Sequence, residues 1–373
     1  MIRKEALVER FADCFLDLDD PRGPNALHDL TEVLFIALLA TLCGATSCCD
    51  MALFARIKED LLRSVLELNY GLPSHDTFSR IFRMLDPKGF EKAFQRFMAA
   101  FSASLKLGRN KGVIAVDGKA LRCAYERGRS HMPSLMVTAW GAKTRMALAN
   151  VLAEEGGEAA AALSLIELLQ LRDCIVTADA LHCRRDTAEA ILAAQGDYVL
   201  AVKNNQPKLL EAAKTAIGTA RRKKGKRSAQ GKEISHGRRE ERMAVVASAS
   251  MVAKELDFPG LNAFAMITSK RGADKTVERY YLLSRYHRPA QLLTIVREHW
   301  GIENRLHWTL DVVLDEDLAR NRKDNAPANL AILRRLALNI ARAHPDKKTS
   351  MRGKLKRAGW DERFMFDMLT NMR

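Results

Sequence analysis

The sequence predicts an α/β fold, in which a mixed sheet with helices packed against it follows an all-helical N-terminal domain. Residues 1–108 carry apolar residues at three-and-four spacing, the pattern of amphipathic helices. After residue 112 the pattern changes to short apolar runs rich in β-branched residues, which is typical of buried strands. Helical segments separate the later runs. The expected order is therefore three strands as a meander, then helix, strand, helix, strand.

The most apolar segment of the chain, "VLFIALLATLCGA" at residues 33–45, lies in the N-terminal domain. It is shorter than the roughly 20 residues that span a bilayer, so it predicts a buried helix, with Thr31 at its opening turn. We expect no membrane association.

A possible DNA-reading element follows in "NYGLPSHDTFSRIFRMLDP". Gly71 and Pro73 break the chain, and Ser74 or Asp76 can cap a new helix that carries Arg80 and Arg83. This pattern is compatible with a helix-turn-helix and equally with two packed helices of an all-α domain.

The sheet is expected from five segments, which are "GVIAVDGKAL", "SLMVTAWG", "RMALANVLA", "CIVTADAL" and "DYVLAVKN". Residues 208–288 predict a basic, strand-rich insertion, in which strands resume at "MAVVASAS", "AFAMITSKR" and "ERYYLLSRY". A helix is expected from Pro289 to Asp311. The catalytic domain would span residues 109–345, and a basic helical tail residues 346–373.

Charge and cysteine content limit the class of partner and the compartment. The 373 residues include 60 Lys and Arg against 45 Asp and Glu, a net charge of +15, which makes a polyanion the leading partner. The N-terminus does not have the pattern of a secretory signal, and the seven cysteines are scattered, as in reduced intracellular proteins. We expect a cytoplasmic, nucleoid-associated protein.

Three carboxylates are the candidates for chemistry. Asp117 ends the apolar run "VIAVD", Asp179 follows "CIVTA", and Glu303 lies in the later helix. Polar side chains converge at the carboxyl ends of strands in such sheets. Three acids together could hold two hard divalent cations, Mg²⁺ or Mn²⁺, for displacement at phosphorus. An aspartate after a strand can also simply cap a turn.

The helix around Glu303 allows a second interpretation. In an ideal helix His299, Glu303 and His307 fall on one face at i, i+4 and i+8, where they could share a zinc ion. The close His-Glu-x-x-His pattern of zinc proteases is absent, and a zinc site leaves Asp117, Asp179 and the basic charge unexplained.

Several motifs in fixed order carry a family resemblance. "IAVDGKALR", "TADALHCRRDTAEAI", "GDYVLAVKNNQPKL", "HGRREER" and "REHWGIENRLHWTLDVVLDEDLARNR" resemble the DDE transposases of bacterial insertion sequences. The best match is the ISAs-type branch that includes the H-repeat-associated proteins. "GLPSHDTFSRIFRMLDP" resembles the N-terminal region of that branch, so the resemblance covers nearly the whole chain.

The resemblance implies a ribonuclease-H-like catalytic domain with a β-rich insertion before the helix that bears the third acid. Asp117, Asp179 and Glu303 would form the DDE triad, separated by 62 (179 minus 117) and 124 (303 minus 179) residues. The implied activity is metal-dependent DNA strand cleavage and strand transfer at the terminal inverted repeats, with target DNA as second partner and a homodimer pairing the two ends. A catalytically silent DNA-binding relative or repressor is the alternative.

One signature of many relatives is missing. They carry Tyr, two residues, Arg, three residues, Glu, six residues, Lys around the third acid, and this chain has Val296, His299 and Leu310 at the three flanking places. The roles of that Tyr, Arg and Lys therefore cannot be transferred. Arg297, His299 or His307 is expected to replace them at the DNA phosphates.

Further DNA contacts are expected near the three acids. Trp300 and Trp308 are aromatic platforms for a base or, preferably, core anchors. Solvated surface charge is the alternative for Lys119 and Arg122. The full set of expected contacts is Lys119, Arg122, Lys203, Asn205, Arg297, His299, Trp300, Asn304, His307, Arg320 and Arg322.

Overall fold

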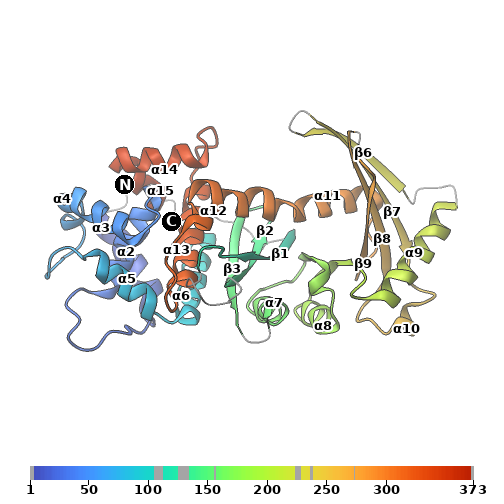
Figure 1. Ribbon diagram of the computed structural model, residues 1–373, viewed down its shortest axis with the longest axis horizontal. Helices are drawn as coiled ribbons and strands as arrows, with labels where there is room; N and C mark the ends of the chain where they lie inside the picture. Colours follow the sequence, from blue (N-terminus) through green and yellow to red (C-terminus); the bar gives the residue numbers. More distant parts are fainter. Residues whose placement is uncertain are drawn as a thin grey trace.

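The protein has a helical end and a long sheet covered by helices (Figure 1). The computed structural model describes residues 4–104, 112–124, 134–154, 157–222, 228–235, 238–272 and 274–370. The predicted boundary between residues 108 and 109 lies outside the described residues. Both ends of the chain lie at the helical end.

The N-terminal helices form around one apolar helix. They are α1 (Lys4–Phe15), α2 (Leu30–Leu42), α3 (Cys48–Ile57), α4 (Glu59–Arg63), α5 (His75–Met84) and α6 (Pro87–Ser104). Because α2 is apolar on all sides, it is buried almost throughout, as a central helix must be. Its cap is Asp29, whose carboxylate accepts from the Glu32 N–H at 2.9 Å, and Thr31 lies in the opening turn as expected.

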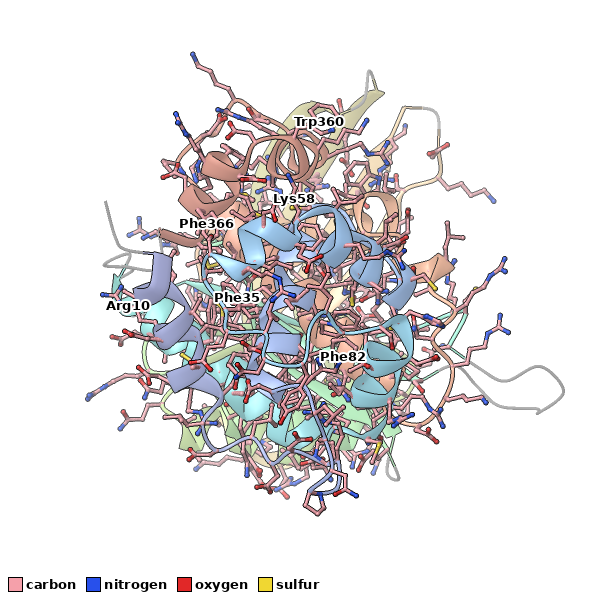
Figure 2. The ribbon with its side chains drawn as sticks, turned by 90° about the vertical axis from the view of Figure 1, so that its left-hand side faces the viewer. Arg10, Phe35, Lys58, Phe82, Trp360 and Phe366 are labelled. Carbon is pink, nitrogen blue, oxygen red and sulfur yellow. The ribbon has the colours of Figure 1, made fainter. Side chains whose placement is uncertain are left out.

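The C-terminal helices belong to the same helical end. Here α13 (Ala326–Ala343) packs against α2, α5 and α6, while α14 (Met351–Trp360) packs against α2 and α15 (Glu362–Thr370) against α1. Figure 2 looks onto this end, where Lys58 lies below Trp360, and the Lys58 ammonium contacts Glu362 of α15 at 2.9 Å. The segment expected as a basic tail is therefore packed on the N-terminal helices.

The candidate helix-turn-helix has the form of packed helices. Residues 64–74 separate α4 from α5, whereas a helix-turn-helix uses a turn of about three or four residues. Ser74 caps α5, which packs against α3 and α13. Arg80 is exposed, but the Arg83 guanidinium lies 2.7 Å from Asp324. The alternative of an all-α packing unit therefore fits this segment.

All strands predicted from the sequence form. The strands are β1 (Val113–Ala120), β2 (Leu135–Gly141), β3 (Met146–Ala153), β4 (Ile175–Ala178), β5 (Asp197–Val202), β6 (Ser228–Ser235), β7 (Arg238–Ser248), β8 (Ala263–Arg271) and β9 (Val277–Leu283). In the described part of the chain they build one nine-stranded sheet in the order β3-β2-β1-β4-β5-β9-β8-β7-β6. The first three are an antiparallel meander, and β1, β4 and β5 are parallel.

The basic insertion extends the core sheet. Strand β9 pairs antiparallel with β5, with Val199 opposite Leu283, so β9, β8, β7 and β6 continue the same sheet. Three of these strands were expected, whereas β6 comes from the basic run and was not. The insertion is thereby held rigidly beside the core strands.

Helices cover both faces of this sheet. One face carries α7 (Gly157–Glu167), α8 (Arg185–Ala193) and α9 (Pro207–Arg222), and a short α10 (Ala253–Leu256) follows β7. The other face carries α6, α13 and α11 (Pro289–His299), which contacts β6 and β7 as well as β1 and β4 (Figure 1). No described helix is both long enough and apolar enough to cross a membrane.

Candidate active site

Asp117 and Asp179 lie side by side where the parallel pairing of β1 and β4 ends. Strands β1 and β4 pair with Val116 opposite Ala178, so the next residue on each chain is an aspartate. Asp117 is the fifth residue of β1, and Asp179 directly follows β4 and opens a 3₁₀ turn, Ala180–His182. Register therefore places two carboxylates at one point of the sheet edge.

Glu303 reaches this edge from a π-helical turn. The turn, Ile302–His307, lies between α11 and α12 (Trp308–Val313), and the Trp308 N–H donates to the carbonyl of Glu303, five residues earlier. Such single π-turns occur inside α-helices frequently at functional sites. The sequence predicted one regular helix here, and the wider turn changes the spacing assumed for His299, Glu303 and His307.

Gly301 allows this segment to lie close to the sheet. A Cβ at Gly301 would stand 2.5 Å from Cη2 of Trp140, which is on β2 and fully buried. The ring cannot move aside in a packed core. The absence of a side chain at residue 301 therefore brings the Glu303 turn against β1 and β2.

The three carboxylates interact electrostatically. Burial, together with the charges of Asp179 and Glu303, raises the pKa of Asp117 to about 7, although the Gly118 N–H donates to Asp117 Oδ1 at 3.0 Å. Burial and the charge of Asp179 also raise the pKa of Glu303. Like charges gathered at one edge oppose ionisation, which is the condition that a bound cation relieves.

The donor atoms of this group fit a hard divalent cation. All three side chains offer carboxylate oxygens, the ligands that Mg²⁺ and Mn²⁺ prefer. Among the described residues, no group of three His, Cys, Asp or Glu side chains is arranged to hold a metal ion. The three carboxylates therefore have the donor atoms that Mg²⁺ or Mn²⁺ requires. Binding such an ion would require the carboxylates to move closer together.

His299 and His307 turn to different partners. His299 Nδ1 lies 3.0 Å from Thr177 Oγ1 of β4, and burial lowers the pKa of His299 to about 4. His307 Nδ1 lies 3.8 Å from Asp117 Oδ2, and burial, with Arg335 and Lys119 nearby, lowers the pKa of His307 to about 3. The shared zinc site is not formed by the described residues. Both imidazoles are neutral and face inward.

Lys119 is turned away from solvent, which corrects its expected role. Its ammonium lies 2.6 Å from Asp311 Oδ1 and 2.7 Å from Asp317 Oδ1, and the side chain is 7% exposed. Next to it, the fully buried pair Arg335–Glu316 closes at 2.8 Å. A buried cation whose carboxylate partners are already in place has an internal, structural role. The alternative of solvated surface charge is also wrong for Lys119.

Other expected DNA contacts divide between surface and structure. Arg122 is 75% exposed, with its Nε 3.5 Å from Asp317, and Arg320 is exposed. Arg322 Nε instead donates to the Cys123 carbonyl at 2.9 Å. Two of the three cations are therefore accessible to a phosphate.

Lys203 and Asn205 follow β5 and both lie near Asp179. The Lys203 ammonium is 4.0 Å from Asp179 Oδ2, and both side chains are at least half exposed. Asn205 Nδ2 donates to the Ala180 carbonyl at 2.6 Å, which secures the turn that Asp179 opens. Lys203 is thus a cation at the open side of the acidic group.

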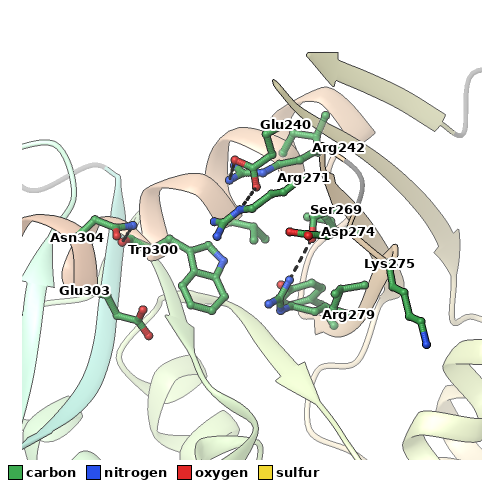
Figure 3. Close-up of a pocket in the computed structure, with 15 residues that line it drawn as sticks. Glu240, Arg242, Ser269, Arg271, Asp274, Lys275, Arg279, Trp300, Glu303 and Asn304 are labelled. Carbon is green, nitrogen blue, oxygen red and sulfur yellow. Dashed lines mark hydrogen bonds and ion pairs between the residues drawn. The ribbon is translucent and has the colours of Figure 1, made fainter. Parts of the chain in front are cut away.

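Trp300 lines a cavity of 420 Å³ between the insertion and the Glu303 turn (Figure 3). The Arg279 guanidinium lies 5.1 Å from the Trp300 ring centroid. Asn304, whose amide donates to the Trp300 carbonyl, and Glu303 stand on the other side of the indole. Arg242, Arg271 and Lys275 add further cations to the wall.

The remaining predicted residues of this segment reach the surface. Arg297 is exposed, and Trp308, for which a core position was preferred, is 56% exposed. Trp308 is therefore not a core anchor.

Two basic features were missed by sequence reasoning. Arg279 lies on β9, and its charge lowers the pKa of Glu303, whereas burial and the charge of Asp179 raise it. Arg145, Arg305 and Arg342 come together from the β2–β3 turn, the π-turn and α13. Burial and the two other charges lower the pKa of Arg342 to about 10. These arginines are far apart in the sequence, so no local pattern predicts that they come together in the fold.

Comparisons with known proteins identify the family of this chain. The family model described as "Transposase DDE domain" matches residues 108–340. The chain belongs to the DDE transposase family. A second model, "DDE_Tnp_1-associated", matches residues 12–98. The family predicted from the sequence motifs is thereby confirmed.

Relatives of this DDE transposase include proteins from Escherichia coli. The H repeat-associated putative transposase YhhI of strain K12 is 29% identical over 354 residues, 92% of each chain. Putative transposase YncI of strain O157:H7 is 30% identical over 355 residues, 92% of this chain and 90% of that protein.

A more distant structural similarity exists to the piggyBac transposase synaptic complex with hairpin DNA. It covers 97% of this chain and 78% of that one, with a TM-score of 0.42 and 14% identity. A similarity this low carries no argument about fold or function.

The positions that depart from the family signature are unsuited to DNA contact. Val296 and Leu310 are buried, at 6% and 0% exposed, and His299 bonds to Thr177. These three positions therefore place no exposed Tyr, Arg or Lys beside Glu303.

Proposed function

We propose that this protein is the transposase of an insertion sequence, which binds the terminal inverted repeats of its element, cleaves DNA strands there and joins the freed 3′-hydroxyl to target DNA. The observation that carries the proposal is the meeting of Asp117, Asp179 and Glu303 at one sheet edge. An antiparallel meander beside parallel strands supports a ribonuclease-H-like core around it.

Asp117, Asp179 and Glu303 would hold two Mg²⁺ or Mn²⁺ ions. Such ions, when bound, activate a water or hydroxyl nucleophile and stabilise the leaving oxygen. The Gly118 N–H orients Asp117 through its 3.0 Å hydrogen bond. The Thr177–His299 hydrogen bond ties α11, and with it the Glu303 turn, to β4. The chain thus positions its third acid from a separate element.

The cations around this edge are proposed to bind the DNA backbone. Arg279 and Lys203 flank the acids, and Arg122 and Arg320 are exposed. Arg305 lies in the Glu303 turn itself and interacts with Arg145. Phosphate contacts by Lys and Arg supply most of the sequence-independent affinity for DNA. Pairing of two element ends would engage a homodimer.

The test is cleavage of a labelled duplex that carries a terminal repeat of the element. Asp117→Asn, Asp179→Asn and Glu303→Gln should each lower the Mg²⁺-dependent cleavage rate by about a hundredfold or more, roughly 2.7 kcal/mol. Each substitution removes a metal-binding charge and nearly preserves shape. DNA binding, measured by gel shift, should persist in all three.

The matched control is Asp60→Asn, which removes an exposed acid on α4 and should leave cleavage unchanged. Wild-type cleavage by any triad variant would refute the role of that residue. Binding without cleavage by the unaltered protein, in Mg²⁺ and in Mn²⁺, would instead establish the silent DNA-binding alternative.

A further inference from the structure

Glu158 is a fourth carboxylate that lies against the acidic group. It is the second residue of α7, which begins shortly after β3. A Cβ added to Gly118, the neighbour of Asp117, would stand 2.4 Å from Glu158 Oε1 and 2.7 Å from its Cδ. The Glu158 carboxylate therefore occupies the space that a side chain at residue 118 would fill.

This carboxylate acts on the known acids. After burial, Asp179 and Glu303, the charge of Glu158 contributes to the raised pKa of Asp117. A glutamate in the first turn of a helix is stabilised by the helix dipole while pointing to solvent. That stabilisation does not require proximity to another carboxylate, so the helix terminus alone does not explain its position.

His182 holds Glu158 in this place. His182 is 1% exposed, and its Nε2 lies 3.3 Å from Glu158 Oε1. Neither ring nitrogen makes a hydrogen bond among the described residues. The backbone N–H of His182 donates to the Asp179 carbonyl at 3.0 Å. A buried imidazole from the Asp179 turn is thus directed at Glu158.

We propose that Glu158 is a fourth ligand of the metal centre, binding one divalent cation directly or through a water molecule, with His182 as its positioning residue. The inference rests on the proposed function, because it assigns a further residue to the same site. Hard cations take several carboxylate and water oxygens, and partners that orient a ligand commonly tune metal affinity. Gly118 would leave the approach to Asp117 open.

The experiment is Mn²⁺ titration of the full chain without DNA, followed by electron paramagnetic resonance of the free ion. Glu158→Gln should weaken the tighter Mn²⁺ affinity by about tenfold or more. Glu158→Asp should weaken it similarly, because it retains the charge and withdraws the carboxylate by one methylene. If Glu158 acted only through its charge and did not bind the ion, Glu158→Asp would keep the wild-type Mn²⁺ affinity.

Two further variants make the test specific. Gly118→Ala should also weaken Mn²⁺ binding, because its Cβ displaces the Glu158 carboxylate without changing any charge. Glu154→Gln is the matched control: this exposed acid four residues away pairs with Lys88 and should leave Mn²⁺ affinity unchanged. Thermal unfolding of each variant verifies that the chain is folded.

The outcomes separate this inference from the proposed function. If Asp117→Asn abolishes tight Mn²⁺ binding while Glu158→Gln and Gly118→Ala keep wild-type affinity, the fourth ligand is wrong and the proposed function stands. If the wild-type protein binds no Mn²⁺ and also fails to cleave, both are wrong. If Glu158→Gln, Glu158→Asp and Gly118→Ala all weaken Mn²⁺ binding while Glu154→Gln does not, the result supports Glu158 as the fourth ligand.

Discussion

At the scale of single residues, Asp117 is the side chain whose ionisation is most affected by its surroundings within the acidic group. Its pKa of about 7 lies above the 3.8 of an ordinary aspartate, so the folded, metal-free protein favours the protonated acid. The stability that this group contributes is fully present below about pH 4 and is lost as pH rises through 7. A cation that bound Asp117 would therefore displace a proton near neutral pH.

Asp117→Asn should consequently stabilise the metal-free protein more at pH 8 than at pH 5. The substitution removes a carboxylate that is costly to ionise, and the difference between the two pH values is expected to be on the order of 2 kcal/mol. Urea unfolding in EDTA at both pH values measures it. Equal effects at pH 5 and pH 8 would contradict the raised pKa.

Residue identity alone did not decide how each predicted side chain is used. Lys119 and Arg122 stand three positions apart in one motif, yet Lys119 is closed in by Asp311 and Asp317 while Arg122 is exposed. The partners of Lys119 come from nearly 200 residues further along the chain. Their arrival depends on tertiary packing, so only the structure separates an internal cation from an accessible one.

At the scale of elements, the segment from α11 to α12 determines where the third acid lies. The apolar pattern of "REHWGIENRLHW" predicts a helix, and a helix forms on both sides. The π-turn at its centre has no such signature, and it begins directly after Gly301, which lies against the ring of Trp140. Contact between two elements, and not local preference, sets the position of Glu303.

Gly301→Ala should therefore destabilise the protein by roughly 1–3 kcal/mol, since the new methyl group collides with a buried ring. Cleavage should fall further than stability explains, because the Glu303 turn is pushed from the sheet. The control is Gly218→Ala on α9, where a Cβ meets nothing within 4 Å and alanine should be neutral or stabilising by up to about 1 kcal/mol. Thermal unfolding and single-turnover cleavage test both, and a Gly301 variant indistinguishable from the control would refute this account.

At the scale of the whole molecule, one sheet joins the edge that carries Asp117 and Asp179 to the basic insertion. The C-terminal helices α14 and α15 pack on the N-terminal helices. Through β5 and β9 the insertion becomes part of the core sheet, so Arg279 and the Trp300 cavity have a definite position beside Glu303. A second cluster, Arg145, Arg305 and Arg342, gathers with no carboxylate partner recorded among the described residues. Uncompensated cations held together are suited to a polyanion.

Arg145→Ala and Arg305→Ala should each weaken DNA binding to any sequence and reduce the slope of log affinity against log salt by about one. Both side chains are exposed, and both residues contact Arg342 of α13. Arg185→Ala is the control, because Arg185 lies on α8 across the sheet and is paired with Asp257. Fluorescence anisotropy from low to moderate salt gives the slope; an unchanged slope in both variants would exclude this surface.

The sequence by itself determined the α/β class, the strands other than β6, and the family, because apolar runs and ordered motifs are local properties of the chain. It also singled out Asp117, Asp179 and Glu303. Tertiary structure alone decided that the insertion would continue the core sheet, that α14 and α15 would pack on the N-terminal helices, and that Lys119 would turn inward and Trp308 outward. The role of Glu158 belongs to this second group, because its approach to Gly118 and His182 depends on how α7 packs beside β1 and the Asp179 turn. Packing contacts between distant segments are selected by shape and burial, and no local pattern records them.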